Sequence, residues 1–193
     1  MSHTAWYIAR SSGLVAWVLL AAAMLWGLLL ATRVFGRNPG PKWLTDLHRF
    51  LGALAVVFTT IHIGALVADN YVQFGIKEVL VPMASPWKPV AVAAGVVAFW
   101  ILLAVEISSL LMKHMPRRLW RAIHLTSFVL FLSATAHAFA AGTDARNTIF
   151  LMLCVAFSAV IVLLGLARLA TRNAKRPASR ELSRSAPDGS AAR

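Results

Sequence analysis

Residues 48–62 have the sequence HRFLGALAVVFTTIH, an apolar stretch that begins and ends with histidine. Residues 124–137, HLTSFVLFLSATAH, repeat this arrangement. Both stretches lie in longer apolar runs that are able to cross a bilayer, where ionisable side chains are costly and usually serve a function. A hydrogen bond to a neighbouring helix readily explains one such histidine. Two pairs with similar spacing on two helices instead indicate a shared ligand-binding role.

The composition around these stretches is that of a membrane protein. Of the 193 residues, 59% are hydrophobic and only 13% are charged, which leaves too few polar residues to cover a soluble domain. The 19 Lys and Arg outnumber the 7 Asp and Glu, but they cluster between apolar runs and in the tail, so no nucleic-acid partner is expected. The single cysteine, Cys154, excludes an internal disulfide and a thiolate metal cluster, and no CxxCH motif is present for covalent c-type haem.

Five apolar segments are long enough to cross a bilayer core, which needs about 20 helical residues. The expected spans are residues 11–32, 44–67, 89–112, 119–141 and 148–170. Helices are expected because lipid cannot satisfy open backbone groups, and the segments lack the alternation of a membrane β-strand. The predicted fold class is therefore an all-α membrane protein, a five-helix transmembrane bundle. The loop of residues 70–88 fits a short interfacial helix and a plain loop equally well.

The distribution of basic residues predicts the orientation of the bundle. Lys and Arg are concentrated after the first, third and fifth spans, whereas the other two loops are nearly balanced. Because cytoplasmic loops carry the excess of Lys and Arg, we expect the N-terminus outside and the C-terminus in the cytoplasm of a multi-pass cell (inner) membrane protein. Residues 1–170 form the expected membrane domain. Residues 171–193, rich in Ala, Arg, Ser and Pro, are expected to form a basic, disordered cytoplasmic tail.

The histidines are expected at two depths. The second and fourth spans run in the same direction, so His48 and His124 lie near the cytoplasmic side and His62 and His137 near the outer side. The two histidines of one helix are roughly 20 Å apart at 1.5 Å per residue, too far to bind one metal ion together. Each depth instead has one imidazole from each helix, as a six-coordinate haem iron requires. Two b-type haems, held by the pairs His48–His124 and His62–His137, suit electron transfer more than gas binding.

The spacing on the fourth span does not fit an ideal helix. The 14-residue step from His48 to His62 leaves these residues within about 40° of each other around the helix axis. The 13-residue step from His124 to His137 leaves about 140°. A distorted helix or a rotated haem is therefore needed at the fourth span.

The spacings H-x13-H and H-x12-H on two helices resemble those of the ferric reductase-like transmembrane domain. Ferric reductases, NADPH oxidases and the haem-binding membrane subunit of bacterial methionine sulfoxide reductase systems share this domain. The resemblance covers roughly residues 5–170 and matches the NADPH oxidase pattern in the same order. The resemblance implies bis-histidine b-type haems that carry electrons outward, with His48 paired with His124 and His62 paired with His137. It also implies that the 13-residue step is a trait of the family. The six-helix oxidases carry these histidines on helices three and five; here they lie on two and four.

Three arginines are candidate partners for the anionic haem propionates, for which arginine is the preferred cation. Arg49 adjoins His48, and Arg121 lies three residues before His124. For these two, a propionate contact and a simple cytoplasmic charge fit equally well. Arg10, in RSSGL, is expected to precede the first span and to face outside against the charge rule. In the family an arginine at the corresponding helix start contacts the outer haem, and the resemblance implies that role for Arg10.

We expect neither a flavin nor a nicotinamide site in this chain, because no glycine-rich nucleotide loop is present. Electrons are then expected from a separate cytoplasmic flavoprotein reductase or from membrane quinol, and the external acceptor is ferric iron, oxygen or a redox protein. No catalytic residue is assigned, and the chain is interpreted as the membrane subunit of an oxidoreductase. Alternatives that stay open are a quinol-linked dihaem cytochrome, a haem-handling or transport protein, and a structural bundle whose histidines only form hydrogen bonds.

Overall fold

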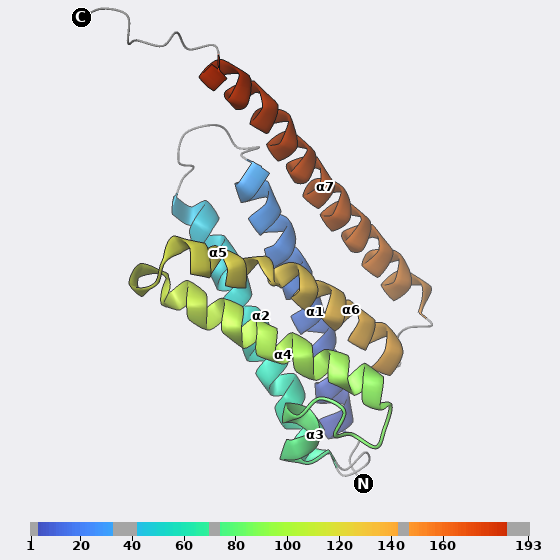
Figure 1. The fold of residues 1–193 in the computed structure, drawn as a ribbon. Coiled ribbons are helices and arrows are strands. Elements are labelled where there is room, and N and C mark those ends of the chain that lie inside the picture. The colour runs from blue at the N-terminus through green and yellow to red at the C-terminus, as the bar shows by residue number, and fades with distance from the viewer. Residues whose placement is uncertain (1–3, 33–41, 70–73, 143–146, 185–193) are drawn as a thin grey trace, which may run out of the picture.

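The computed structural model describes residues 4–32, 42–69, 74–142 and 147–184, with side chains as far as residue 167. Every regular element in these ranges is helical (Figure 1). The elements are α1 (Thr4–Thr32), α2 (Lys42–Ala68), α3 (Ile76–Leu80), α4 (Pro89–Leu110), the 3₁₀ turn η1 (Met112–His114), α5 (Arg117–Leu125), α6 (Ser127–Ala141) and α7 (Thr148–Arg184).

In the described part of the chain, five helical segments are long and apolar enough to cross a membrane, which confirms the predicted all-α bundle of five spans. They are Thr4–Thr32, Lys42–Ala68, Pro89–Leu110, Arg117–Ala141 and Thr148–Ala167. The boundaries agree closely with those expected, except at the first span. Because α1 begins at Thr4, Arg10 lies inside the helix and does not precede it, contrary to our expectation. The orientation of the bundle stays a prediction.

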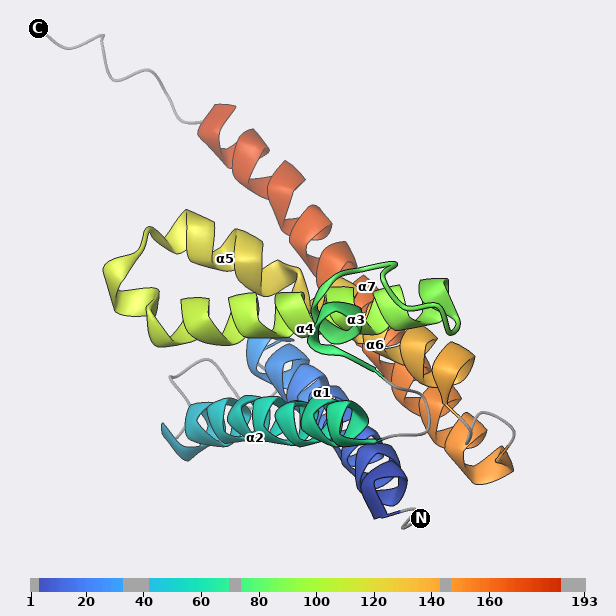
Figure 2. The same cartoon turned by 90° about the horizontal axis from the view of Figure 1, so that it is seen from below.

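The long helices form two antiparallel pairs. α2 packs along α1, and α6 packs along α4, whereas the backbones of α2 and α6 scarcely approach each other. Figure 2 shows the α1–α2 pair facing the pair made by α4 with α5 and α6. α7 packs against α1. Side chains of α2 and α6 therefore meet between the two pairs across a separation wider than ordinary helix packing.

The largest apolar core joins α1, α6 and α7. Trp17 of α1, Phe131 of α6 and Cys154 of α7 are buried together in it. The indole N–H of Trp17 donates to the Oγ1 atom of Thr135 at 3.0 Å, so the polar group of this large aromatic side chain is satisfied. This packing fixes α6 relative to α1.

The connection between α2 and α4 contains the short helix α3, one of the two alternatives that the sequence allowed. Phe74 and Val79 of this connection are buried against Val92 and Val96 near the start of α4. The connection therefore covers the end of the bundle where α2 finishes and α4 begins.

The fourth span is divided into two helices at Thr126, between His124 and His137. The N–H of Thr126 donates to the carbonyl oxygen of Ile123 at 3.0 Å, and its hydroxyl donates to the same oxygen at 2.6 Å. Bonding to the third residue back, in place of the fourth, winds the chain more tightly than an α-helix. The distortion required by the 13-residue step is thus present between the two histidines.

The backbone of α7 continues as a helix through Arg184. Residues 185–193 lie outside the described part of the chain. The division into a membrane domain of residues 1–170 and a tail of residues 171–193 stays a prediction.

Candidate functional site

The four candidate histidines meet in two pairs between the helix pairs. The ring centroids of His48 and His124 are 6.1 Å apart, and the planes of the rings are inclined by 71°. The ring centroids of His62 and His137 are 6.3 Å apart, with an inclination of 78°. α2 contributes one ring to each pair, and α5 and α6 contribute the opposite rings. These are the two pairs expected from the depths of the residues.

The separation within each pair fits two imidazoles on opposite sides of one iron. A metal–nitrogen bond to histidine is about 2 Å long and the ring nitrogen lies roughly 1.2 Å from the ring centroid, which places two opposite ligands with centroids about 6.4 Å apart. A direct hydrogen bond between ring nitrogens would place the centroids only about 5.3 Å apart. The observed 6.1 and 6.3 Å are too long for a direct hydrogen bond between the rings, and they fit both an atom held between the rings and an edge-to-face contact of the two rings.

The donor set is suited to a macrocycle rather than to a bare ion. Among the described residues, no group of three or more His, Cys, Asp or Glu side chains is placed to hold a metal ion. Two imidazoles complete a six-coordinate site only where another molecule supplies the four remaining donors. A porphyrin supplies four nitrogens in one plane, so the residues present fit haem.

His62 and His137, which we call the outer pair after their predicted depth, are both oriented by backbone carbonyl groups. Nδ1 of His62 lies 2.7 Å from the carbonyl oxygen of Ala9 in α1, and Nδ1 of His137 lies 2.8 Å from that of Ala91 in α4. A carbonyl oxygen only accepts, so Nδ1 of each ring carries the hydrogen. The lone pair of each neutral ring is then on Nε2, the form of histidine that ligates a metal.

Glycines on α1 and α4 make room for these outer rings. A Cβ atom on Gly13 would lie 2.8 Å from Nδ1 of His62, and one on Gly95 would lie 2.6 Å from Nδ1 of His137. Such distances are shorter than carbon and nitrogen atoms tolerate without a bond. The bare backbone of the two glycines is therefore what allows each ring to reach its carbonyl group.

The second pair, His48 and His124, which we call the inner pair after its predicted depth, is held differently. A Cβ atom on Gly27 would lie 3.0 Å from Cε1 of His48, whose buried Nδ1 makes no hydrogen bond of normal geometry within the described residues. The carbonyl group of Ala23 interacts with this ring electrostatically. The ring of His124 stacks on Trp120, with centroids 5.0 Å apart and planes at 23°. The indole N–H of Trp120 is also buried and has no hydrogen-bond partner within the described residues.

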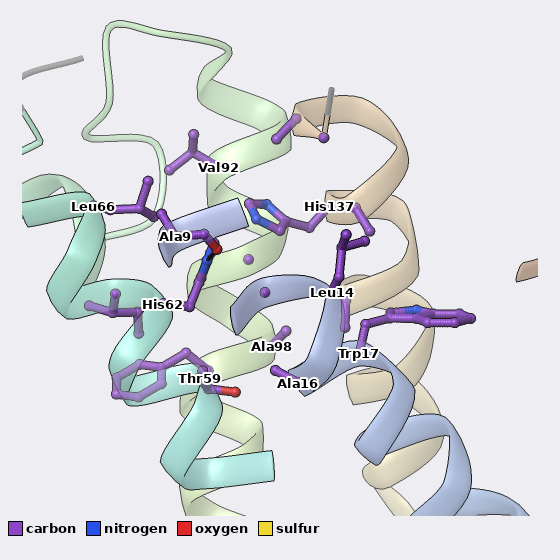
Figure 3. Close-up of a pocket in the computed structure, with 18 of the residues that line it drawn as sticks. Ala9, Leu14, Ala16, Trp17, Thr59, His62, Leu66, Val92, Ala98 and His137 are labelled. Carbon is purple, nitrogen blue, oxygen red and sulfur yellow. Dashed lines mark hydrogen bonds between the residues drawn. The ribbon is translucent and has the colours of Figure 1, made fainter. Parts of the chain in front are cut away.

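A cavity of about 380 Å³ lies beside the outer pair. Figure 3 shows His62 and His137 directed into it from α2 and α6. Arg10 also lines this cavity, and its guanidinium carbon lies 5.2 Å from the centroid of the Trp6 ring, which forms part of the same wall. Arg10 thus supplies a positive charge beside the outer pair.

The other two candidate arginines do not line this cavity. Arg49 and Arg121 are both exposed at the end of the bundle that holds the inner pair. Arg49 interacts electrostatically with Glu106 of α4, whose carboxylate lies against Gly52 with no room for a Cβ atom there. The structure therefore distinguishes Arg10, which it places at the outer pair, from these two.

The chain matches the family described as the ferric reductase like transmembrane component over residues 11–135. The chain belongs to that family. This ferric reductase-like chain is a multi-pass redox component of a membrane, and domains of the family generally bind haem. The match includes three of the four histidines and ends two residues before His137, on the same helix α6. No curated protein and no solved structure matches the chain.

Proposed function

We propose that this ferric reductase-like chain is a dihaem b-type cytochrome that carries electrons outward across the cell membrane. Its donor is a cytoplasmic flavoprotein reductase, and its acceptor is ferric iron, oxygen or a redox protein. The observation that carries the proposal is the repeated ring separation of 6.1 and 6.3 Å at two depths of one bundle. A direct hydrogen bond between the two rings of a pair would require a shorter centroid separation, of about 5.3 Å.

In this proposal the residues of the chain hold the haems in place, and each iron would supply a reversible one-electron couple. The 14-residue step on α2 separates the two depths by roughly 20 Å along the helix. The carbonyl groups of Ala9 and Ala91 hold the outer rings with Nε2 available for the iron. At the inner depth, Trp120 orients His124 by stacking.

The charges of the bundle support the cytoplasmic flavoprotein as donor. The end that carries the inner pair has an exposed basic cluster, consisting of Lys113, Arg117, Arg118 and Arg121. Such clusters are typical of cytoplasmic faces, and they attract acidic partners at increased rates. The inner pair is then the entry point for electrons.

Transport across vesicles tests the proposal. The purified chain is reconstituted with ferricyanide trapped inside the vesicles, and a reduced flavoprotein is added outside. We expect ferricyanide reduction only in vesicles that contain the haem-loaded chain. Reduction at the rate of protein-free vesicles, with the chain correctly inserted, contradicts the proposed function.

A second candidate donor, membrane quinol, is favoured by Glu106. Oxidation of a quinol releases protons, and a carboxylate at membrane depth is able to accept one. Glu106 occupies such a position between α2 and α4, beside Arg49. If quinol is the donor, Glu106→Gln is expected to slow haem reduction by a quinol analogue at least tenfold while reduction by dithionite is unchanged. Equal quinol rates in the variant and the wild type exclude this role of Glu106.

Arg10 is expected to hold the outer haem through a propionate. The variant Arg10→Gln should lose haem from the outer site about tenfold more readily, because a hydrogen bond to a charged group contributes about 1.5 kcal/mol or more. Transfer of haem to an added apo-acceptor protein measures the loss. Arg121→Gln is the matched control, since Arg121 does not line the outer cavity. Equal transfer from the outer site in both variants contradicts the role of Arg10.

A further inference from the structure

Among the described residues, three glycines face histidine rings, and they share a local pattern. Each follows an alanine by four residues, in the segments ARSSG (residues 9–13), AMLWG (residues 23–27) and AVAAG (residues 91–95). We call these segments the Ala-x3-Gly sites. In an α-helix the carbonyl group of the alanine already accepts the N–H of the residue four positions later, which here is the glycine. A carbonyl oxygen has a second lone pair, and the missing side chain of the glycine leaves it accessible from the side.

The spacing of these sites on α1 equals the spacing of the histidines on α2. Ala9 and Ala23 are 14 residues apart, as are His48 and His62. Because α1 and α2 are antiparallel neighbours, the first alanine faces the outer histidine and the second faces the inner one. One Ala-x3-Gly site therefore serves each depth on this side of the bundle.

The second helix pair, α4 with α6, has the same arrangement at the outer depth and a different one at the inner depth. Ala91 of α4 faces His137, and the position 14 residues later is Val105. Four residues beyond it stands Ser109 in place of glycine, and its hydroxyl donates to the Val105 carbonyl oxygen at 2.7 Å. The side chain thus occupies the lone pair that glycine leaves accessible at the other sites. The outer pair has two Ala-x3-Gly sites and the inner pair has one.

We propose that the three Ala-x3-Gly sites are positioning sites for the haem ligands, an inference that rests on the proposed function. Each site accepts the Nδ1–H of one histidine and thereby fixes the tautomer and the rotation of that ring. For His62 and His137 the bonds are formed, at 2.7 and 2.8 Å. For His48, Gly27 leaves the same space beside the ring, and the equivalent bond to Ala23 would complete the third site. A ligating imidazole that donates from its other nitrogen is a stronger base, so the sites also favour the ferric iron.

The test replaces each glycine by alanine in the full chain and follows both haems separately. In Gly13→Ala and Gly95→Ala we expect roughly 10- to 100-fold weaker retention of the outer haem, which is the usual effect of losing a partner behind a metal ligand. Any outer haem that stays bound should show a raised midpoint potential, while the inner haem is unchanged. In Gly27→Ala the inner haem alone should change. The readouts are the haem-to-protein ratio and a redox titration of the bound haems.

The chain contains a matched control for these substitutions. Gly64 lies on α2 two residues after His62, and a Cβ atom there would meet nothing within 4 Å. Gly64→Ala is therefore expected to keep both haems at wild-type potentials. If Gly13→Ala and Gly95→Ala behave like Gly64→Ala, the inference is wrong although the proposed function stands. A wild-type chain without haem contradicts the proposed function itself.

A measurement on the wild type covers the case in which the glycine variants fail to fold. The Nδ1 protons of the ligands are followed by electron–nuclear double resonance after transfer into deuterium oxide. Protons held on backbone carbonyl groups should exchange slowly with deuterium. Complete exchange of the outer ligands' protons within the dead time of the experiment contradicts the inference.

Discussion

The variant His62→Ala is expected to retain one haem where the wild type has two. Removing this ring leaves one imidazole at the outer depth, and a porphyrin held from one side is bound far more weakly. The inner pair, roughly 20 Å away along α2, is unaffected. Haem per chain should fall from two to one, and ferricyanide reduction inside vesicles should fall to the level of protein-free vesicles because the outer half of the path is missing. Haem extraction and the vesicle assay measure these two results.

The pairing makes the controls for this variant specific. His137→Ala should lose the same haem as His62→Ala, whereas His48→Ala should lose the other. His114→Ala should keep both, because His114 is exposed at η1, away from both ring pairs. The account is contradicted if His62→Ala retains two haems, or if His62→Ala and His137→Ala lose haems with different midpoint potentials.

Insertion of one alanine after Thr126 is expected to remove one haem, although it lengthens the histidine step of the fourth span to the value found on α2. An added helical residue turns everything beyond it by about 100° and shifts it by about 1.5 Å. The break at Thr126 already corrects for the shorter step, so the insertion directs either His124 or His137 away from its partner. The haem-to-protein ratio should fall from two to one.

An insertion outside the histidine step is the control. One alanine added after Gly142, where α6 has ended, leaves the relation of His124 to His137 intact and should preserve both haems. Two haems after the insertion at Thr126 would show that the tight turn does not set the register of the two rings.

The main features of the bundle were predictable because they depend on simple patterns. Runs of about 20 apolar residues predict membrane helices whatever their partners are. The two histidine steps predict two depths in the bundle. Because the second and fourth spans run in the same direction, His48 then lies at the same depth as His124. The same geometry required a distortion on the fourth span, but its location was not predictable. The hydroxyl of Thr126 donates to a backbone carbonyl group at the turn, but threonine does this at many helical positions without breaking the helix.

The contributions of α1 and α4 were not predictable from the sequence. Small residues four apart are common in membrane helices, where they usually allow close packing of backbones. Only the tertiary structure shows that Gly13 and Gly95 face histidine rings. The start of α1 was also misplaced, since the residues before Arg10 are apolar and aromatic and continue the helix to Thr4. Arg10 therefore reaches the outer cavity from within a helix.

Electron paramagnetic resonance of the oxidised wild-type chain, together with its haem content, tests the central claim most directly. The account predicts two haems per chain and low-spin ferric signals of the highly anisotropic type. That type is expected because the imidazole planes within each pair are nearly perpendicular, at 71° and 78°. Protein purified without haem, or haem with only high-spin signals, would contradict the assignment of the four histidines as two axial ligand pairs.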